Sequence, residues 1–462
     1  LYDGGGGAGL DDLWAAIAQS PLGAGAFVCA LSDEQLRPPA SALASGDELA
    51  GVLDAERAPE GSFYTLRELW SPVQIDWRSL PTGFNGTLPV YNTSEFLDLA
   101  FVLFRWRLAN FHFGPGTGFT VVAEGGSRVG SVPPGSAGEL RLPLPPGWLD
   151  ADAISLEALD LSGDVIGKWA WMLQSPARVR QRIVDEAVPG PALPADAGAA
   201  PGDAGPSAQA SGDRLEVVAG STRYTFDTTS ARLVGVSADG RTFSFGNGPV
   251  LAAGSATPSS FEARAEGDEY LITATYEGEL RELSWRVLGS GWLVLSYRYA
   301  PSGSYPFYGV SFDYPEALVH SVQWLGRGPG RVWQNRMKGT WHDVWSITRR
   351  PAPLGWDDTQ LAGYFADVYW ARLSTREGRI DVVIDDPGTY LRLFSVGAAP
   401  AQAAFPPGDI SLLHGIAPIG DARFEPAALG PQGQPHVLDG SREISASVYL
   451  RFDGDDRAPA SE

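Results

Sequence analysis

The chain has few of the residues that build disulfides and metal sites. Among its 462 residues there is one cysteine, Cys29, and there are five histidines. One cysteine cannot form an internal disulfide, so the bacterial periplasm or the cytoplasm is favoured over disulfide-bonded secretion, and the compartment itself stays unknown. No spacing of histidine and cysteine matches a metal site. We therefore expect no metal and no other cofactor.

Basic residues are also scarce. Lysine and arginine number 34 against 55 aspartates and glutamates, which gives a formal net charge of −21. Binding to the phosphates of nucleic acid or to an anionic membrane surface needs a basic face, so neither is expected as a partner. No apolar run approaches the length of about 18 residues that a membrane-spanning helix requires. We expect a soluble protein.

Glycine and proline, in contrast, are abundant. The 56 glycines and 36 prolines are typical of a chain of many short strands joined by turns. The length predicts about two to four domains, and a hydrophobic content of 44% is enough to bury sizeable cores. We therefore expect a mainly β, multidomain protein.

Residues 1–70 carry the clearest helical signal. A short helix is predicted near residues 10–19, because apolar residues recur there with helical spacing. A continuous apolar run over residues 26–31 predicts a strand that is buried on both faces, as in a parallel sheet covered by helices. A second helix is predicted over residues 62–72. The apolar face of the first helix consists of Leu10, Leu13, Trp14 and Ile17.

The remaining chain alternates between polar and apolar residues with a period of two. Short alternating segments over residues 71–186 predict a β-sandwich. Residues 187–213 consist almost entirely of Ala, Pro, Gly, Ser and Asp, a composition that indicates a flexible linker. Further alternating segments over residues 214–455 predict a second, larger β-sandwich. Within it, "WLGRGP" at residues 324–329 is predicted to be a structural turn with a buried Trp324.

Three phrases, in this order, resemble glycoside hydrolase family 2, the family of β-galactosidase and β-glucuronidase. The segment of residues 10–36 is similar to the last helix and last strand of that family's catalytic (β/α)8 barrel. "SFYTLRELWSPVQI", residues 62–75, resembles the passage from that barrel into the following sandwich. "VQWLGRGPGRVWQNRMKGTWHDVW", residues 322–345, resembles the C-terminal sandwich of large β-galactosidases. The resemblance covers nearly the whole chain.

The resemblance implies an architecture and an activity. The architecture is the end of a (β/α)8 barrel, then an immunoglobulin-like β-sandwich, the linker, and a large C-terminal sandwich similar to the β-galactosidase small chain. The activity is that of a retaining exo-β-glycosidase, which hydrolyses terminal β-glycosidic bonds of oligo- or polysaccharides with two glutamates of the barrel. If residues 26–31 are the eighth barrel strand, both catalytic glutamates are expected upstream of this chain. Its partners are then a carbohydrate substrate and the N-terminal portion of the enzyme, from the same gene or as a companion chain; a homo-oligomer is left open.

One departure from the family pattern bears on specificity. Family members usually carry a tryptophan followed by an aspartate in the eighth strand, where the indole helps to line the sugar site. Cys29 and Ala30 stand at these positions here. The loss of that indole puts ordinary β-galactosidase specificity in question.

Six residues are candidates for contact with a sugar. Asp33 and Glu34 follow the predicted eighth strand, where they contact a sugar, orient a catalytic group, or merely cap the next segment. Indoles stack on the apolar face of a sugar, and neighbouring polar groups bond its hydroxyls. The other four candidates combine indoles with polar groups and are Trp333, Trp341, His342 and Asp343. The alternative for Trp341 is that it packs into a sandwich core.

Two other readings stay open. In the first, the chain is a non-catalytic carbohydrate-binding or structural subunit of such an enzyme. In the second, weaker reading it belongs to a lyase, because large C-terminal sandwiches occur there too; this rests on analogy of fold alone. For the arginines Arg327, Arg331 and Arg336, structural ion pairs are favoured over recognition of an acidic sugar.

Overall fold

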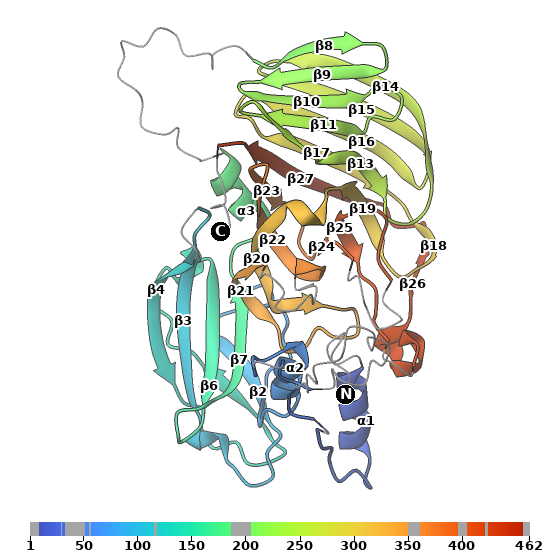
Figure 1. Ribbon diagram of the computed structural model, residues 1–462. Helices are drawn as coiled ribbons and strands as arrows, with labels where there is room; N and C mark the ends of the chain where they lie inside the picture. The colour runs from blue at the N-terminus through green and yellow to red at the C-terminus, as the bar shows by residue number, and fades with distance from the viewer. Residues whose placement is uncertain are drawn as a thin grey trace, which may run out of the picture.

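The protein is described by a computed structural model and is mainly β, with few helices (Figure 1). Two β bodies lie against each other, and two short helices lie beside them near the N-terminus. The structure describes residues 9–28, 30–32, 51–54, 57–114, 118–185, 205–349, 361–395, 404–420 and 424–455.

The two helices form close to where the sequence predicts them. Helix α1 spans Leu10–Gln19 and α2 spans Gly61–Leu69. They pack on each other through a small cluster built on Leu10, Val52 and Leu66. Asp11 and Asp12 lie in the first turn of α1, where their charge suits the positive end of the helix dipole.

The strand predicted over residues 26–31 is wrong for the residues described there. Residues 26–28, 30 and 31 have no strand pairing, and Ser32 makes only an isolated parallel bridge to Leu53. A strand that is apolar on both faces needs partners that cover it, and here Phe27 is 95% exposed and Leu31 68% exposed. Cys29 lies outside the described residues, and the (β/α)8 barrel stays a prediction.

The next body is a sandwich of a three-stranded and a four-stranded antiparallel sheet. Its sheets enclose one core, which includes Phe104, Trp106 and Trp171. Strand β4 is an edge strand that the sequence patterning did not reveal, because most of its residues are exposed. The immunoglobulin-like topology stays a prediction. The first sheet contains β1 (Val73–Gln74), β2 (Thr87–Asn92) and β5 (Ala137–Arg141); the second contains β4 (Phe119–Ser127), β3 (Leu103–Phe111), β6 (Ala153–Leu159) and β7 (Val165–Met172).

The predicted linker at residues 187–213 lies partly outside the described residues. Before it, α3 (Pro176–Arg180) continues into a π-helical turn, Gln181–Asp185. Inside its range the prediction needs a correction, because Ser207–Ser211 forms strand β8. All five residues of β8 are exposed, so its composition carries no apolar signal; main-chain hydrogen bonds to β9 alone hold it at the sheet edge.

The second body is one large antiparallel sheet that nearly closes on itself. Its first strands are β9 (Arg214–Ala219), β10 (Thr222–Asp227), β11 (Leu233–Ala238), β12 (Arg241–Phe243), β13 (Gly246–Leu251), β14 (Ala256–Glu266), β15 (Glu269–Gly278), β16 (Leu280–Leu288) and β17 (Leu293–Tyr299). They are followed by β19 (Tyr308–Asp313), β20 (Val319–Val332), β21 (Trp341–Thr348), β22 (Gly363–Thr375), β23 (Arg379–Ile384), β24 (Tyr390–Leu393), β25 (Ile410–Gly415) and β27 (Ile444–Asp453). A separate two-stranded sheet pairs β18 (Ser302–Tyr305) with β26 (His436–Asp439).

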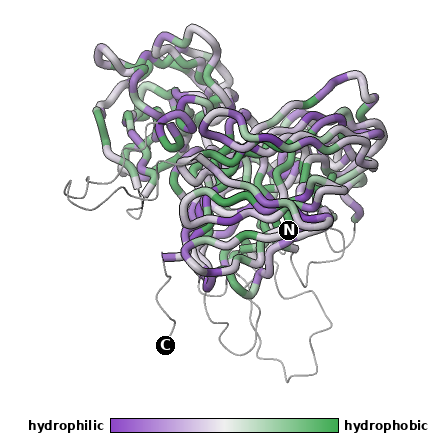
Figure 2. The backbone as a smooth tube through the Cα atoms, turned by 90° about the horizontal axis from the view of Figure 1, so that it is seen from above, coloured by the Kyte–Doolittle hydropathy of each residue, from purple (hydrophilic) through white to green (hydrophobic). Residues whose placement is uncertain are grey.

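The large sheet folds into two layers around one core. In Figure 1, β8 to β11 lie in front of β14 to β17 at the top of the molecule. Strand β22 joins the layers, because Gly363–Phe365 pairs with β24 and Trp370–Ser374 pairs with β23. Large side chains such as Trp285 and Trp324 fill the space between the layers. Figure 2 shows hydrophobic and hydrophilic residues alternating along many of these strands, as expected when one face of a layer is buried.

The segment predicted as a turn, residues 324–329, lies instead inside β20. Trp324 is buried as predicted, with 1% of its surface exposed. The segment stays in the sheet because β20 pairs with β21 on one side and with β22 on the other. Its glycines serve close packing rather than a chain reversal: a Cβ at Gly328 would overlap the indole of Trp345.

Candidate functional site

Three of the predicted sugar contacts meet where the sandwich, helix α2 and the large sheet come together. Trp341, His342 and Asp343 are consecutive residues at the start of β21. Because side chains alternate along a strand, Trp341 and Asp343 point to one face of β21 and His342 points to the other. Strand β21 contacts β7 of the sandwich, and α2 contacts both β7 and β20. The tryptophan and the histidine are therefore enclosed between elements that lie far apart in the sequence.

Trp341 is held by aromatic and cationic neighbours. Its indole is 8% exposed and meets the rings of Tyr64 and Trp345 at centroid distances of 5.7 and 5.3 Å. The Nζ of Lys168 lies 4.7 Å from the ring centroid and the guanidinium of Arg67 lies 5.6 Å from it. Cations at such distances are attracted to the negative faces of an indole. The tryptophan thus connects α2, β7 and β21.

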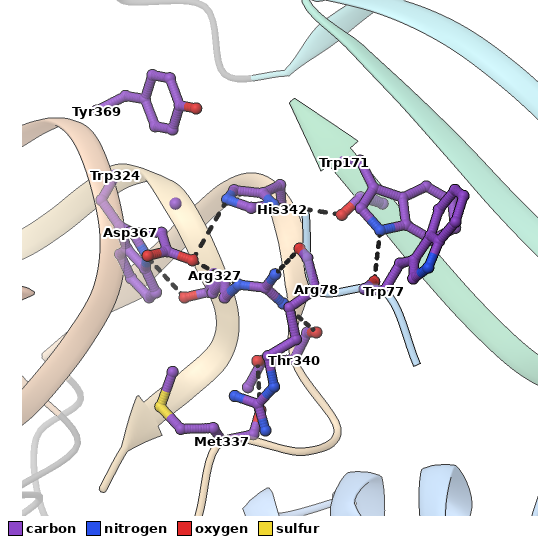
Figure 3. A network of polar contacts seen from close by, with 12 residues as sticks. Trp77, Arg78, Trp171, Trp324, Arg327, Met337, Thr340, His342, Asp367 and Tyr369 are labelled. Atoms are coloured by element: carbon purple, nitrogen blue, oxygen red, sulfur yellow. Dashed lines mark hydrogen bonds and ion pairs between the residues drawn. The ribbon is translucent and has the colours of Figure 1, made fainter. Parts of the chain in front are cut away.

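His342 belongs to a buried polar network that Figure 3 shows from close by. Its Nε2 lies 3.8 Å from Oδ2 of Asp367, and its Nδ1 lies 3.3 Å from the main-chain oxygen of Ala170 in β7. The same carboxyl oxygen accepts a hydrogen bond of 2.6 Å from Nε of Arg327. The histidine thereby links β7 of the sandwich to β20 and β22 of the large sheet.

Arg327 is the centre of this network. Its Nη1 donates to the main-chain oxygen of Thr340 at 3.2 Å, and its Nη2 donates to the main-chain oxygen of Arg78 in the sandwich. With the bond to Asp367, these contacts use all three nitrogens of the guanidinium. A planar group with donors in fixed directions is well suited to connect three segments in this way. The ion pair favoured for Arg327 on sequence grounds is confirmed.

Burial controls the protonation of the network. Desolvation, followed by the positive charge of Arg327, lowers the pKa of His342 from 6.5 to about 4. The histidine is therefore neutral at neutral pH, and its Nδ1 proton donates to the oxygen of Ala170. Desolvation also raises the pKa of the neighbouring Asp343 carboxyl, which accepts a bond from the nitrogen of Val344. His342 could exchange a proton with a bound sugar only if the sandwich and the large sheet moved apart. In this structure the network therefore holds elements in position and does not act as an acid or a base.

Trp333 lies in a different place. Its indole is 1% exposed and packs edge-on against the rings of Tyr364 and Phe405 at 5.3 and 5.8 Å. This cluster also includes Ile416 and Ile419 from the segment after β25. The structure therefore does not bring Trp333 together with Trp341 and His342. Asp33 and Glu34 lie outside the described residues.

The segment between Trp333 and Trp341 connects the large sheet to both N-terminal helices. The main-chain oxygen of Asn335 accepts from the nitrogen of Gly9, the residue before α1. The main-chain oxygen of Lys338 accepts from Oγ1 of Thr65 at 3.0 Å, and the nitrogen of Gly339 donates to Glu68 at 2.5 Å. Thr65 and Glu68 belong to α2. We call residues 333–340 the clasp, because they hold α1 and α2 on the sheet.

Gly339 is the point of closest approach in the clasp. Its φ angle is +80°, a conformation that costs any residue with a Cβ. A Cβ there would lie 2.3 Å from the main-chain carbon of Tyr64 in α2. Only glycine therefore permits this contact between the clasp and the helix.

Sequence reasoning missed Asp367 and Arg78. The one signal that could have revealed Asp367 is the presence of an aspartate within the apolar run "YFADVYW". Its φ of +48° marks a bend in β22, which the sequence does not reveal. Arg78 contributes only its main-chain oxygen, so its side-chain type carries no information about the contact.

The described residues contain no group of three or more His, Cys, Asp and Glu side chains that could hold a metal ion. Nor does any helix in the described part of the chain have the length and apolarity needed to cross a membrane.

Comparison with known proteins identifies part of the large sheet. Residues 255–405 match the family model described as beta galactosidase small chain. This region, which runs from the start of β14 to beyond β24, is therefore β-galactosidase-like, as the sequence predicts for the C-terminal part. It includes the clasp, Arg327, His342 and Asp367. No curated protein matches the chain.

Two solved structures match the chain at low similarity. A galactose 1-epimerase from Lactobacillus acidophilus NCFM is 11% identical with a TM-score of 0.32, and the match covers 54% of this chain and 98% of that one. A galactose mutarotase related enzyme from Lactobacillus acidophilus is 12% identical with a TM-score of 0.25, covering 55% and 99%. Likenesses at these scores carry no argument about function.

Proposed function

We propose that this chain is the C-terminal part of a retaining exo-β-glycosidase similar to β-galactosidase, and that it acts on terminal β-glycosidic bonds of oligo- or polysaccharides. The catalytic glutamates lie upstream of this chain, in the same gene or in a companion chain. The match of residues 255–405 to the beta galactosidase small chain supports the enzyme class.

The observation that carries the proposal is an uncovered apolar surface beside α1. Phe27 is 95% exposed, Leu22 92%, Leu31 68% and Leu13 53%. Isolated exposed apolar residues are ordinary, but four within one short segment indicate a surface that another part of a protein covers. If the resemblance to family 2 holds, the rest of the catalytic barrel would lie at this place. The upstream portion would cover these side chains and supply strands beside residues 26–31.

The clasp gives this chain its part in the reaction. Residues 333–340 hold α1 and α2, and the Arg327 network holds the sandwich against the same sheet. Both would fix the end of the barrel relative to the C-terminal body, since neither the helices nor the sandwich can shift without breaking partly buried hydrogen bonds. Trp341, His342 and Asp343 would thus shape a sugar site through the elements that they position. Their direct contact with substrate, and that of Trp333, Asp33 and Glu34, stays a prediction.

Hydrolysis of a panel of p-nitrophenyl β-glycosides tests the proposal. This chain by itself should hydrolyse none of them, whereas the chain joined to or co-purified with the upstream portion should hydrolyse at least one with retention of configuration. Hydrolysis by this chain alone would contradict the placement of the glutamates upstream. No hydrolysis by the combined protein would instead favour a carbohydrate-binding or structural subunit.

A further inference from the structure

A cleft that borders the clasp, but contains no residue of the Arg327 network, separates the N-terminal helices from the sandwich. Its volume is about 700 Å³, within the usual range for small-molecule sites. Helix α1 forms one wall, and the end of α2 with the first residues of the sandwich forms the other. Lys338 of the clasp closes one end. The lining residues that matter below are Trp14, Trp70, Gln74, Asp76, Thr93 and Lys338.

Two tryptophans line this cleft and supply apolar ring faces to it. The rings of Trp14 and Trp70 meet edge to face, with centroids 5.9 Å apart and planes inclined by 62°. In such a pair, the ring that presents its edge keeps both of its faces free of the other ring. Trp70 is 41% exposed, whereas the other apolar residues of α2 are buried or half-buried. An indole placed this way can receive the apolar face of a ligand.

Polar groups around the indoles have hydrogen-bonding capacity left over. The Nε2 of Gln74 donates to the main-chain oxygens of Glu68 and Ser71, so its carboxamide oxygen remains available as an acceptor. The hydroxyl of Thr93 donates to Ser71 and can still accept. Asp76 is exposed at the cleft. Lys338 supplies donors there, its Nζ lying 3.7 Å from Glu68. Acceptors and donors beside an aromatic face match a ring that carries hydroxyls.

Charge narrows the class of ligand. Two carboxylates, Asp11 and Asp76, line the cleft against one cation, Lys338. A net acidic lining repels phosphates, sulfates and uronic acids, so the cleft is suited to a neutral ligand.

We propose that this cleft binds a neutral sugar, with the ring stacked on Trp70 and its hydroxyls bonded by Asp76, Gln74 and Thr93. The existence of the site rests on the cleft, the indole pair and the unused acceptors. The choice of a sugar over another neutral polyol rests on the proposed function.

Ligand-detected NMR and isothermal titration calorimetry on the full chain test this site without requiring catalysis. The probes are methyl β-D-galactopyranoside, lactose, cellobiose, maltose and a galactan oligosaccharide, with glucuronic acid as the anionic comparison. We expect saturable binding of at least one neutral sugar and none of glucuronic acid. Absence of binding by every neutral probe would overturn the proposal, whatever the hydrolysis assays show.

Three cleft variants and one control locate the binding. Trp70→Ala should weaken it about tenfold or more, the loss expected when one stacking face is removed. Asp76→Ala, which changes an exposed side chain, should weaken it as well. Phe119→Ala is the matched control, because it removes an aromatic ring of β4 that is 43% exposed, much like Trp70, and does not line the cleft. Trp70→Phe keeps an aromatic face and should retain part of the affinity, which separates loss of stacking from loss of folding. Equal affinity of the native chain and Trp70→Ala would overturn the site.

Discussion

Arg327 and Asp367 face each other across 2.6 Å although regular pairing of their strands would not bring them together. The register between β20 and β22 shifts on both sides of Arg327, and Asp367 bends β22 with a φ of +48°. These irregularities direct the two charged groups away from the layered core and towards the sandwich. The arginine then reaches the main-chain oxygen of Arg78. An irregularity in one body therefore forms the contact between two bodies.

Removing the side chain of Arg327 should strongly destabilise the contact between the sandwich and the large sheet. Arg327→Met is expected to lower the free energy of unfolding by about 3–5 kcal/mol, because it leaves Asp367 and two main-chain oxygens without their donor. Arg264→Met is the matched control, since its pair with Glu266 is on the surface and should contribute less than about 1 kcal/mol. Urea unfolding at neutral pH measures both. Equal losses in the two variants would contradict a buried role for Arg327.

Alanine substitutions at Gly339 and Gly330 should separate two losses of stability. One is the strain of a positive φ angle, and the other is the overlap of a Cβ with α2. Gly339 and Gly330 have φ angles of +80° and +70°, but only Gly339 lies against α2, and a Cβ at Gly330 would meet nothing within 4 Å. Gly330→Ala should cost about 1–2 kcal/mol from the backbone alone. Gly339→Ala should cost about 2–5 kcal/mol and should also expose α2 to proteolysis. Thermal unfolding and limited proteolysis give the two readouts, and similar behaviour of the two variants would argue against the clasp.

The stability of the protein should decrease in mild acid because of His342. Its pKa is about 4 in the folded chain and 6.5 when unperturbed, so between these values the unfolded chain takes up a proton that the folded chain does not. The contribution of His342 is thus complete above pH 6.5 and is lost as the pH falls towards 4. His342→Gln keeps a donor for Ala170 and should flatten the pH dependence measured by urea unfolding. His112→Gln, at an exposed site, should leave it unchanged.

The apolar surface beside α1 should bind hydrophobic dyes and promote self-association without stabilising the fold. Phe27→Ser removes a side chain that is 95% exposed, so the free energy of unfolding should change by less than about 0.5 kcal/mol. Binding of a hydrophobic dye and self-association should both decrease, because less apolar surface faces water. Leu161→Ser, at an exposed leucine of the sandwich, is the control and should leave both unchanged. A large loss of stability in Phe27→Ser would show that Phe27 packs within this chain.

Local patterns revealed much of the secondary structure. Helix α1 follows from apolar residues at helical spacing, and most strands of the sandwich follow from alternation. Where the pattern was silent the prediction failed: β8 and β4 are edge strands whose residues are largely exposed, so burial left no periodic mark on them. The strand predicted at residues 26–31 failed in a different way, since its apolar pattern is present but the described residues there make no strand pairing.

The site was predicted less completely than the fold. The composition of residues 333–343 marked this stretch as unusual, and its glycines, tryptophans and His342 do lie at a junction. Nothing local indicated that Trp333 would face Tyr364 and Phe405 while Trp341 would face Tyr64. Partners so distant in the chain are chosen by packing, which depends on the position of every layer.

The sequence by itself determined that this is a β-rich protein with a net negative charge, that two helices lie near the N-terminus, and that residues 255–405 are β-galactosidase-like. These properties depend on composition, on periodicity and on short phrases, all of which are local. Only the tertiary structure decided that Arg327, His342 and Asp367 form one network and that the clasp holds α2. The physical reason is that bulges, bends and left-handed residues direct side chains from the large sheet towards the sandwich and the helices, and these directions follow from the packed chain as a whole.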